Sequence, residues 1–359
     1  MTTIDGLVDD AVSRDRPLAS AVVVLTALDG EVTQTAVAGT TRSWDDDRGA
    51  AAADAGEPAA VDTVFDLASI TKLFTATALL LALDQRGMRD GDVVAAALPE
   101  LGALPGRTVT FADLLRHTAG WPAEWSDNGP GPDAWDRFRA QPREAEADPR
   151  YRYSCVGYIW AGLAVEALTG EPLDAAVRRL VLDPLGMAST MFAPPPSLRP
   201  RIAATEYQRQ PARGLVHGSV HDETAWALGG VAGNAGMFGT APDLLRFAEL
   251  LRGDGFVDGR RVLPEWVLAA MTADRLPERL DDRPAYGQAL GPRVADAAWM
   301  GALARDNAVG HTGFTGTSML TTPGGAHSVI ILTNRVHPSR HWNDLGALRS
   351  RIADEAAKQ

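Results

Sequence analysis

Four consecutive residues, Ser69-Ile70-Thr71-Lys72, place a hydroxyl and an amine three positions apart, directly after a short apolar strand predicted over residues 64–67. Residues i and i+3 lie on one face of a helix, so the Lys72 amine can reach the Ser69 oxygen. Burial among apolar neighbours lowers the pKa of an amine, and a neutral amine is a general base. The tetrapeptide therefore predicts a serine nucleophile activated by lysine. The alternative is an N-cap serine beside a solvated lysine, a common pattern.

Two further segments have the residue types to complete such a site. Tyr153-Ser154-Cys155 begins an apolar stretch that ends at Thr169-Gly170, which predicts a helix with the tyrosine at its start, where it can share a proton with Lys72. Near the other end, His311-Thr312-Gly313-Phe314 precedes an alternating hairpin pattern over residues 318–333. A glycine in this position lets a substrate approach the strand backbone closely.

The elements that must position these residues fall into two groups. Residues 19–39 form a hairpin pattern around Asp29-Gly30, residues 69–200 carry mainly helical signals, and strand patterns return after residue 202. The sequence therefore predicts an α/β (α+β) domain from residues 1–66 plus 202–359, with an inserted helical domain over residues 67–201. We expect the active site in the groove between them.

The ordered set of motifs resembles one known family, the penicillin-recognising serine enzymes, in the branch that holds D-alanyl-D-alanine carboxypeptidases, class C β-lactamases and family VIII esterases. The resemblance spans nearly the whole chain. It rests on Ser-x-x-Lys, Tyr-Ser-x and His-Thr-Gly in this order, and on the segments 67–72, 114–120, 183–187, 229–233 and 240–244.

The resemblance implies the β-lactamase/transpeptidase-like fold, an antiparallel sheet flanked by helices with a helical insertion. It implies Ser69 as the acylated nucleophile, Lys72 as its base and Tyr153 as the proton relay to the leaving group. The backbone N–H groups of Ser69 and Phe314 would form the oxyanion hole. The family relatives use no metal and no other cofactor.

Two positions depart from the penicillin-active pattern. Cys155 stands where many relatives have asparagine, and His311 replaces the usual lysine, so a β-lactam or peptide carboxylate should bind less well. We expect both residues, with Thr312 and Gly313, to contact the substrate. Cys155 as the nucleophile is the alternative, because thiols are good nucleophiles.

Tryptophans crowd a Gly/Pro-rich loop after residue 120, which in the family resembles the rim of the acyl pocket. Trp121 and Trp125 on this loop predict a hydrophobic or aromatic acyl group, and Trp226 is a weaker pocket candidate. The alternative, equally weighted, is that the tryptophans pin the loop to the helical domain.

Composition excludes several classes of protein. A chain of 359 residues with 45% hydrophobic and 22% charged residues is typical of a globular protein, and no apolar run approaches the ~20 residues of a membrane span. A net charge of −12 argues against nucleic acid as a partner. The acidic start, Met1-Thr2-Thr3-Ile4-Asp5, lacks a basic leader, which predicts a cytoplasmic protein without a membrane partner. The spacing of its histidines matches no zinc motif.

The predicted function is hydrolysis of a carboxylic ester or small amide through a Ser69 acyl-enzyme, with a small-molecule acyl substrate as partner. The first alternative hands the same acyl group to an amine or alcohol in a biosynthetic pathway. A D-amino-acid peptidase, a β-lactamase and a non-catalytic binding relative are further alternatives. The sequence leaves the acyl group, the acceptor and the oligomeric state open.

Overall fold

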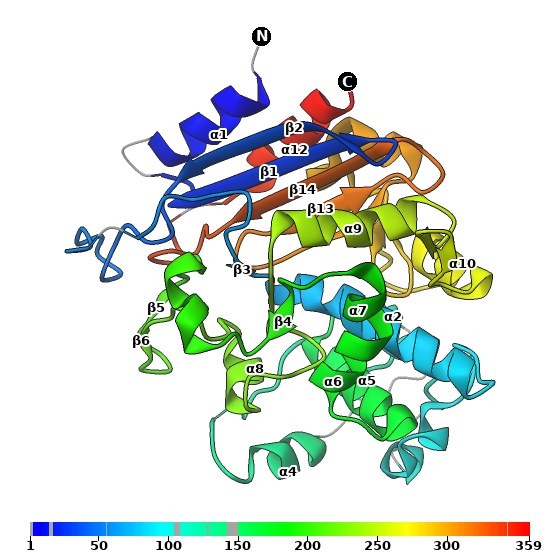
Figure 1. Cartoon of the computed structure of the whole chain (residues 1–359). Coiled ribbons are helices and arrows are strands. Elements are labelled where there is room, and N and C mark those ends of the chain that lie inside the picture. The colour runs from blue at the N-terminus through cyan, green and yellow to red at the C-terminus, as the bar shows by residue number, and fades with distance from the viewer. Residues whose placement is uncertain are drawn as a thin grey trace.

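The computed structural model describes residues 3–13, 17–54, 56–103, 108–127, 129–141, 150–342 and 344–359. Met1 and Thr2, which belong to the stretch used to predict a cytoplasmic location, lie outside these ranges. Figure 1 shows a strand layer with helices above it and a mainly helical region below it.

The main sheet has seven strands in the order β10-β11-β12-β13-β14-β1-β2, and every neighbouring pair is antiparallel. Its strands are β1 (Ala21–Leu28), β2 (Glu31–Gly39), β10 (Gly287–Gln288), β11 (Arg293–Val294), β12 (Val309–Thr312), β13 (Ser318–Thr321) and β14 (His327–Thr333). Strand β1 pairs with both β2 and β14, which joins the first strands of the chain to the last. The two predicted hairpins are confirmed, and the first turns at Asp29 and Gly30, both with positive φ.

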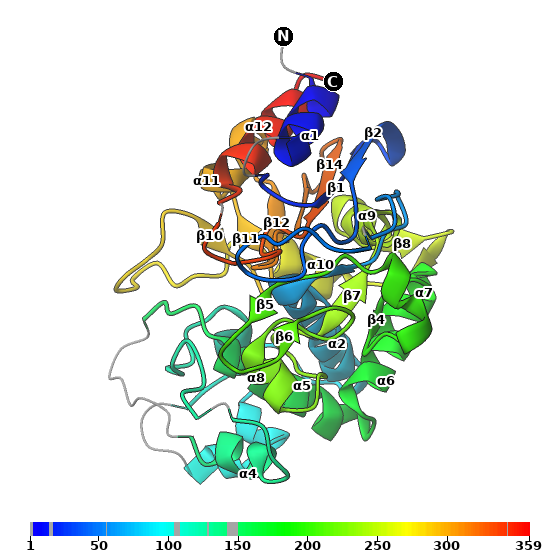
Figure 2. The same ribbon diagram turned by 90° about the vertical axis from the view of Figure 1, so that its left-hand side faces the viewer.

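Alternating side chains of the central strands build a separate core on each face of the sheet. On one face Val22, Val24 and Ile331 pack with α1 (Ile4–Ser13), α11 (Ala297–Met300) and α12 (Gly346–Ala356). On the other face Val23, Leu25 and Ile330 belong to the larger core, with α9 (Ala241–Arg252) against β13 and β14. Figure 2 shows α1 and α12 side by side on the outer face, close to both chain ends.

The larger core continues into the helical region, where two apolar helices pack against each other. These are α2 (Thr71–Gln85) and α5 (Cys155–Thr169), which are buried along most of their lengths. The other helices are α3 (Phe111–Leu115), α4 (Ala134–Arg139), α6 (Leu173–Val177), α7 (Asp183–Leu185), α8 (Glu223–Ala227) and α10 (Glu265–Thr272). Helix α5 ends before Gly170, as predicted, and this glycine has the left-handed conformation, while Thr110 with Asp113 forms a capping box at the start of α3.

Short strands link the two regions, and the first of them, β3 (Phe65–Asp66), confirms the strand predicted over residues 64–67. The three-stranded sheet β3-β7-β4 consists of β3 (Phe65–Asp66), β7 (Met237–Gly239) and β4 (Met191–Phe192). Two further pairs are β5 (Tyr207–Gln208) with β6 (Gly214–Leu215), and β8 (Phe256–Val257) with β9 (Arg260–Arg261). The other short strands have only two or three residues each, which is too little periodicity to be found from a pattern. In the described part of the chain, no helix is long and apolar enough to cross a membrane.

Candidate active site

Ser69 lies in a sharp turn between strand β3 and helix α2. The strand ends at Asp66, residues Ala68–Ile70 form one turn of 3-10 helix, and α2 begins at Thr71. Ala68 has φ of 47°, a conformation that costs energy for any residue with a side chain and that clusters at functional sites. Ser69 therefore lies in the 3-10 turn directly before the α-helix that carries Lys72.

The buried carboxyl group of Asp66 fixes this strained turn. Its Oδ1 accepts a hydrogen bond from the Ala68 N–H at 2.8 Å, and its Oδ2 accepts one from the His221 N–H at 2.7 Å. Burial raises the pKa of Asp66, while the charge and N–H of His221 and the N–H of Ala68 act in the opposite direction. Asp66 thus ties the nucleophile turn to the segment before α8, a role that the sequence analysis missed.

The loop between β12 and β13 is fastened to the same turn. The Thr315 hydroxyl donates to the Asp66 carbonyl at 2.7 Å, and the Thr317 hydroxyl donates to the Leu67 carbonyl at 3.1 Å. A Cβ on Gly313 would lie 2.1 Å from Thr317 Oγ1 and 2.5 Å from the Leu67 oxygen. Gly313 is therefore required for contact between the loop and the turn. The sequence predicted instead that the missing side chain of Gly313 leaves room for the substrate.

Lys72 is fully buried and directs its ammonium group at three segments. Nζ lies 3.1 Å from Ser69 Oγ, 3.5 Å from Cys155 Sγ and 3.0 Å from the Asn234 carbonyl oxygen. An ammonium group has three N–H donors, so these partners use all of them.

The direction of the Lys72 pKa differs from the sequence-based prediction. Burial by itself lowers this pKa, as predicted, but the acidic groups of Cys155 and Tyr153 and the Asp222 carboxylate favour the ammonium form and raise the pKa above its ordinary value. The prediction of a lowered pKa was wrong because the partners of a buried amine come from distant segments.

Tyr153 is the third member of the predicted catalytic group. The Lys72 Nζ lies 5.0 Å from the centroid of its ring. Burial raises the pKa of the phenol, and Lys72 and the Ser69 hydroxyl beside it lower that pKa in part. The structure therefore brings Ser69, Lys72 and Tyr153 together, with phenol and ammonium both holding their protons at neutral pH.

Two buried histidines flank the Tyr153 ring, with ring centroids 4.5 Å away for His117 and 6.0 Å away for His311. Burial, followed by nearby cationic side chains, lowers the pKa of both imidazoles well below its usual value. His311 is therefore neutral and only 1% exposed. The positive charge comes instead from Arg293 on the neighbouring strand β11, whose guanidinium lies 5.8 Å from the Tyr153 ring centroid.

A cavity of about 340 Å³ opens beside Ser69. The residues that line it come from the nucleophile turn, the start of α5, the start of α8 and two loops, and they are Ala68, Ser69, Glu124, Tyr153, Cys155, His221, Asp222, Glu223, Thr224, Ala235, Phe314 and Arg340. Among the described residues, neither the Ser69 nor the Phe314 backbone N–H has a hydrogen-bond partner. Both amides are therefore available to a substrate oxygen.

Several predicted substrate contacts lie elsewhere. Trp121 and Trp125 are 2% exposed and pack in the larger core, where Trp121 stacks on Trp160, so they pin the loop and do not line the cavity. Trp226 is partly buried beneath the Arg213 guanidinium and is also absent from the lining.

The cavity lining also lacks His311, Thr312 and Gly313. In this segment only the following residue, Phe314, lines the cavity. Strand β12 places His311 and Thr312 against β13, and Gly313, directly after the strand, lies against the nucleophile turn. The exposed Phe314 therefore marks the point where this segment meets the cavity.

The sequence did not predict the charged residues of the cavity, above all Glu124, Asp222 and Arg340. Glu124 follows Trp121 by three positions in a loop whose sequence has no periodicity. Asp222 has the residue type of a helix N-cap, and in the structure it is the N-cap of α8. No signal in the sequence separates such residues from ordinary surface carboxylates.

A family model described as Beta-lactamase matches residues 7–353. The chain belongs to the β-lactamase family. A protein named putative D-alanyl-D-alanine carboxypeptidase from Salmonella agona (strain SL483) is 30% identical over 309 residues, which cover 78% of this chain and 71% of that protein.

Solved structures share the fold of this family member over almost its whole length. EstCE1, described as a hydrolase with promiscuous acyltransferase activity, superposes with a TM-score of 0.73 at 22% identity and covers 98% of this chain and 97% of its own. Unliganded simvastatin synthase (LovD) from Aspergillus terreus gives a TM-score of 0.72 at 19% identity, with 99% and 96% coverage. At these identities the likeness concerns the fold.

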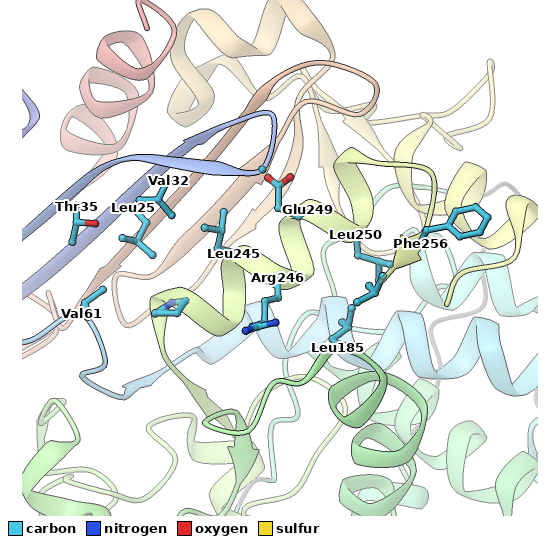
Figure 3. A pocket seen from close by; sticks show the side chains of 13 residues that line it. Leu25, Val32, Thr35, Val61, Leu185, Leu245, Arg246, Glu249, Leu250 and Phe256 are labelled. Atoms are coloured by element: carbon cyan, nitrogen blue, oxygen red, sulfur yellow. The ribbon is translucent and has the colours of Figure 1, made fainter. Parts of the chain in front are cut away.

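A second cavity, of about 460 Å³, lies between β1, β2 and α9 (Figure 3). Its lining is largely apolar and includes Leu25, Val32, Leu245 and Phe256, with the Arg246 side chain beside Leu185. None of the residues predicted for the catalytic site of this family lines it. Within the described ranges, no group of three or more His, Cys, Asp or Glu side chains could hold a metal ion.

The contact between loop and turn yields a test of stability. Gly313→Ala should lower the free energy of unfolding by about 1–3 kcal/mol, because the new methyl group overlaps the Leu67 carbonyl and the Thr317 hydroxyl. Thermal unfolding followed by circular dichroism measures the loss. Gly91→Ala is the matched control, since nothing lies within 4 Å of its Cβ position. Equal melting temperatures for the two variants would show that the turn does not need this contact.

The pKa directions predict how turnover depends on pH. Raised pKa values of Lys72 and Tyr153 keep both groups protonated near neutrality, so the base form grows as pH increases. We expect kcat/KM for a neutral ester to keep rising from about pH 7 to about pH 9. The measurement subtracts the rate of Ser69→Ala at each pH. A plateau that begins near pH 7 would contradict these directions.

Proposed function

We propose that the protein is a serine hydrolase that cleaves a carboxylic ester or small amide through an acyl-enzyme on Ser69. The observation that carries the proposal is the 3.1 Å contact between Lys72 Nζ and Ser69 Oγ, at a cavity large enough for a small acyl substrate. Membership of the β-lactamase family supports the same chemistry. We further propose that residues 1–66 with 202–359 and residues 67–201 form two domains, with this cavity in the groove between them.

In the proposed acylation step, the pair of Lys72 and Tyr153 first loses one proton. The neutral Lys72 amine then takes the proton from the Ser69 hydroxyl while Oγ attacks the carbonyl carbon of the substrate. The N–H groups of Ser69 and Phe314 donate to the oxygen that becomes negative. As the tetrahedral intermediate collapses, Tyr153 passes a proton to the departing alkoxide or amine.

Deacylation repeats these steps with water. The Tyr153 and Lys72 pair removes a proton from the water that attacks the ester bond to Ser69, and the serine oxygen leaves with a proton. An alcohol or amine in place of that water gives the acyltransferase, our second candidate. The open cavity beside Ser69 favours keeping this candidate, since it has room for an acceptor.

Cys155 serves as a wall residue in this proposal. Burial raises the pKa of its thiol to about 12, which leaves almost no thiolate at neutral pH, and its sulfur accepts a hydrogen bond from Lys72.

A carboxypeptidase like the relative from Salmonella agona needs a cation for the carboxylate of its peptide substrate. In this cavity the only guanidinium, on Arg340, is already paired with Glu206 and Glu223. Peptidase and β-lactamase activities are therefore less suited to the site than ester hydrolysis.

The proposed nucleophile is tested by replacing it. Ser69→Ala should abolish turnover of p-nitrophenyl esters and covalent labelling by a fluorophosphonate, while the melting temperature stays close to that of the wild type, because only one hydroxyl is removed. Intact mass spectrometry measures the labelling. The Cys155→Ser variant is the matched control and should still be labelled on Ser69. Labelling that survives in Ser69→Ala would refute the proposal.

The proposed base is tested by a double-mutant comparison. Lys72→Ala should lower kcat about as far as Ser69→Ala does, and the double variant should lose little more, because nucleophile and base act as one unit. The comparison uses kcat for one ester in the three variants. Losses that multiply in the double variant would mean that Lys72 acts independently of Ser69.

A further inference from the structure

His117 follows helix α3 in a backbone conformation that usually belongs to glycine. Its φ is 63°, and the Thr118 N–H donates to the Asp113 carbonyl at 2.9 Å, which are the features of a helix end closed by a left-handed residue. This conformation costs free energy for a residue that has a Cβ. The His117 side chain is nevertheless retained and only 2% exposed. The chain therefore keeps a buried side chain at a position whose backbone favours glycine.

The imidazole of His117 carries a second cost. Its Nδ1 lies 3.1 Å from the Ser154 nitrogen and accepts that N–H, so Nδ1 has no proton and the ring proton is on Nε2. Burial, followed by the charges of Lys72, His311 and Arg293, lowers the pKa of the ring well below its usual value, which keeps the ring in this neutral form. Nε2 is buried and has no partner in the described residues. A buried donor without an acceptor costs free energy, so stability alone does not explain this ring.

His117 binds the backbone on both sides of Tyr153. Its main-chain carbonyl accepts the Arg152 N–H at 2.9 Å, and its Nδ1 accepts the Ser154 N–H. Residues 151–154 belong to no helix or strand, so the place of this segment depends on single contacts such as these. The N–H groups directly before and after Tyr153 in the chain therefore have the same partner residue.

The same imidazole packs against the Tyr153 ring. The two ring centroids are 4.5 Å apart, with an angle of 37° between the ring planes. A second neighbour, Tyr158, lies at 5.1 Å, and its hydroxyl donates to the last carbonyl of α3 at 2.8 Å, which fixes that ring. The Tyr153 phenol lies beside the Ser69 hydroxyl and Lys72. His117 thus holds the Tyr153 side chain and the adjoining backbone at once.

We propose that His117 is a positioning residue that holds the Tyr153 phenol in the orientation needed to pass a proton to the leaving group. The inference rests on the proposed Ser69 hydrolase and adds a residue to it. In the step concerned, the departing group takes the Tyr153 proton as its bond to the carbonyl carbon breaks, and Tyr153 regains a proton from the Lys72 ammonium. A misplacement of about 1 Å can cost ~10²-fold in rate. His117 does not line the cavity, so it acts through Tyr153.

The test uses p-nitrophenyl, phenyl and ethyl butanoate, which form the same acyl-enzyme and differ only in the leaving group. p-Nitrophenolate leaves without a proton, whereas ethoxide needs one. In His117→Leu, which lacks the acceptor for the Ser154 N–H, we expect the ratio of kcat/KM for the p-nitrophenyl ester to that for the ethyl ester to rise about tenfold or more, with the phenyl ester in between. Tyr153→Phe should raise the same ratio, and adding His117→Leu to it should change the ratio little further.

Two further variants separate positioning from stability. His117→Asn places Oδ1 as many bonds from the backbone as Nδ1 and tolerates the left-handed conformation, so it should keep the ratio close to that of the wild type. His217→Leu removes a half-buried histidine whose Nε2 contacts the Ile202 carbonyl at 2.8 Å, outside the cavity, and should also keep the ratio. An unchanged ratio in His117→Leu, or an equal rise in His117→Asn, would overturn the inference, while Ser69-dependent turnover would leave the proposed hydrolase intact.

A direct measurement keeps the inference testable if none of these esters is turned over. Tyrosine labelled with ¹³C at Cζ gives one NMR signal for each of the five tyrosines, and the signal lost in Tyr153→Phe belongs to Tyr153. Its chemical shift reports the hydrogen bonding of the phenol. The shift should be the same in the wild type and His117→Asn and should move in His117→Leu.

His117→Gly also lacks the acceptor but suits the backbone, so it takes the place of His117→Leu if that variant does not fold. The Tyr153 signal should move in this variant as well. A Tyr153 signal that stays unmoved in a folded variant without the acceptor would reject the inference, whatever the fate of the catalytic proposal.

Discussion

The site depends on one buried ammonium group. Lys72 Nζ is inaccessible to water, so each of its N–H groups needs a protein partner, and it finds them in Ser69, Cys155 and the Asn234 carbonyl. These partners belong to the nucleophile turn, the start of α5 and the loop before β7. Burying this charge therefore fixes three segments at one point. The same contacts hold the proton that must be lost before Lys72 can act as a base.

The second constraint is the strained turn that presents Ser69. Ala68 keeps its unfavourable backbone conformation because the Asp66 carboxylate binds its N–H, and the Thr315 and Thr317 hydroxyls bind the two preceding carbonyls. These bonds also bring the loop after β12 against the turn. As a result the free N–H of Phe314 and that of Ser69 face one cavity, an arrangement that neither segment could produce alone.

Charge distinguishes this member of the β-lactamase family from a site built for carboxylates. The cation expected at position 311 is replaced by a buried neutral imidazole, and Arg293 on the next strand instead brings a guanidinium to 5.8 Å from the Tyr153 ring centroid. The lining of the cavity beside Ser69 holds Glu124 and Asp222. Asp222 also raises the pKa of Lys72, so a carboxylate of the cavity lining acts on the catalytic proton equilibrium as well.

Local chemistry in the sequence determined the two hairpins, the apolar helices with their caps and the spacing of Ser69 and Lys72, because turn residues, periodicity and an i, i+3 pair act over a few positions. Only the tertiary structure decided the direction of the Lys72 pKa, the burial of Trp121 in the core and the place of Glu124 in the cavity. Each depends on which distant segments meet. Burial and electrostatic interaction are set by neighbours in space, and a single sequence records neighbours only along the chain.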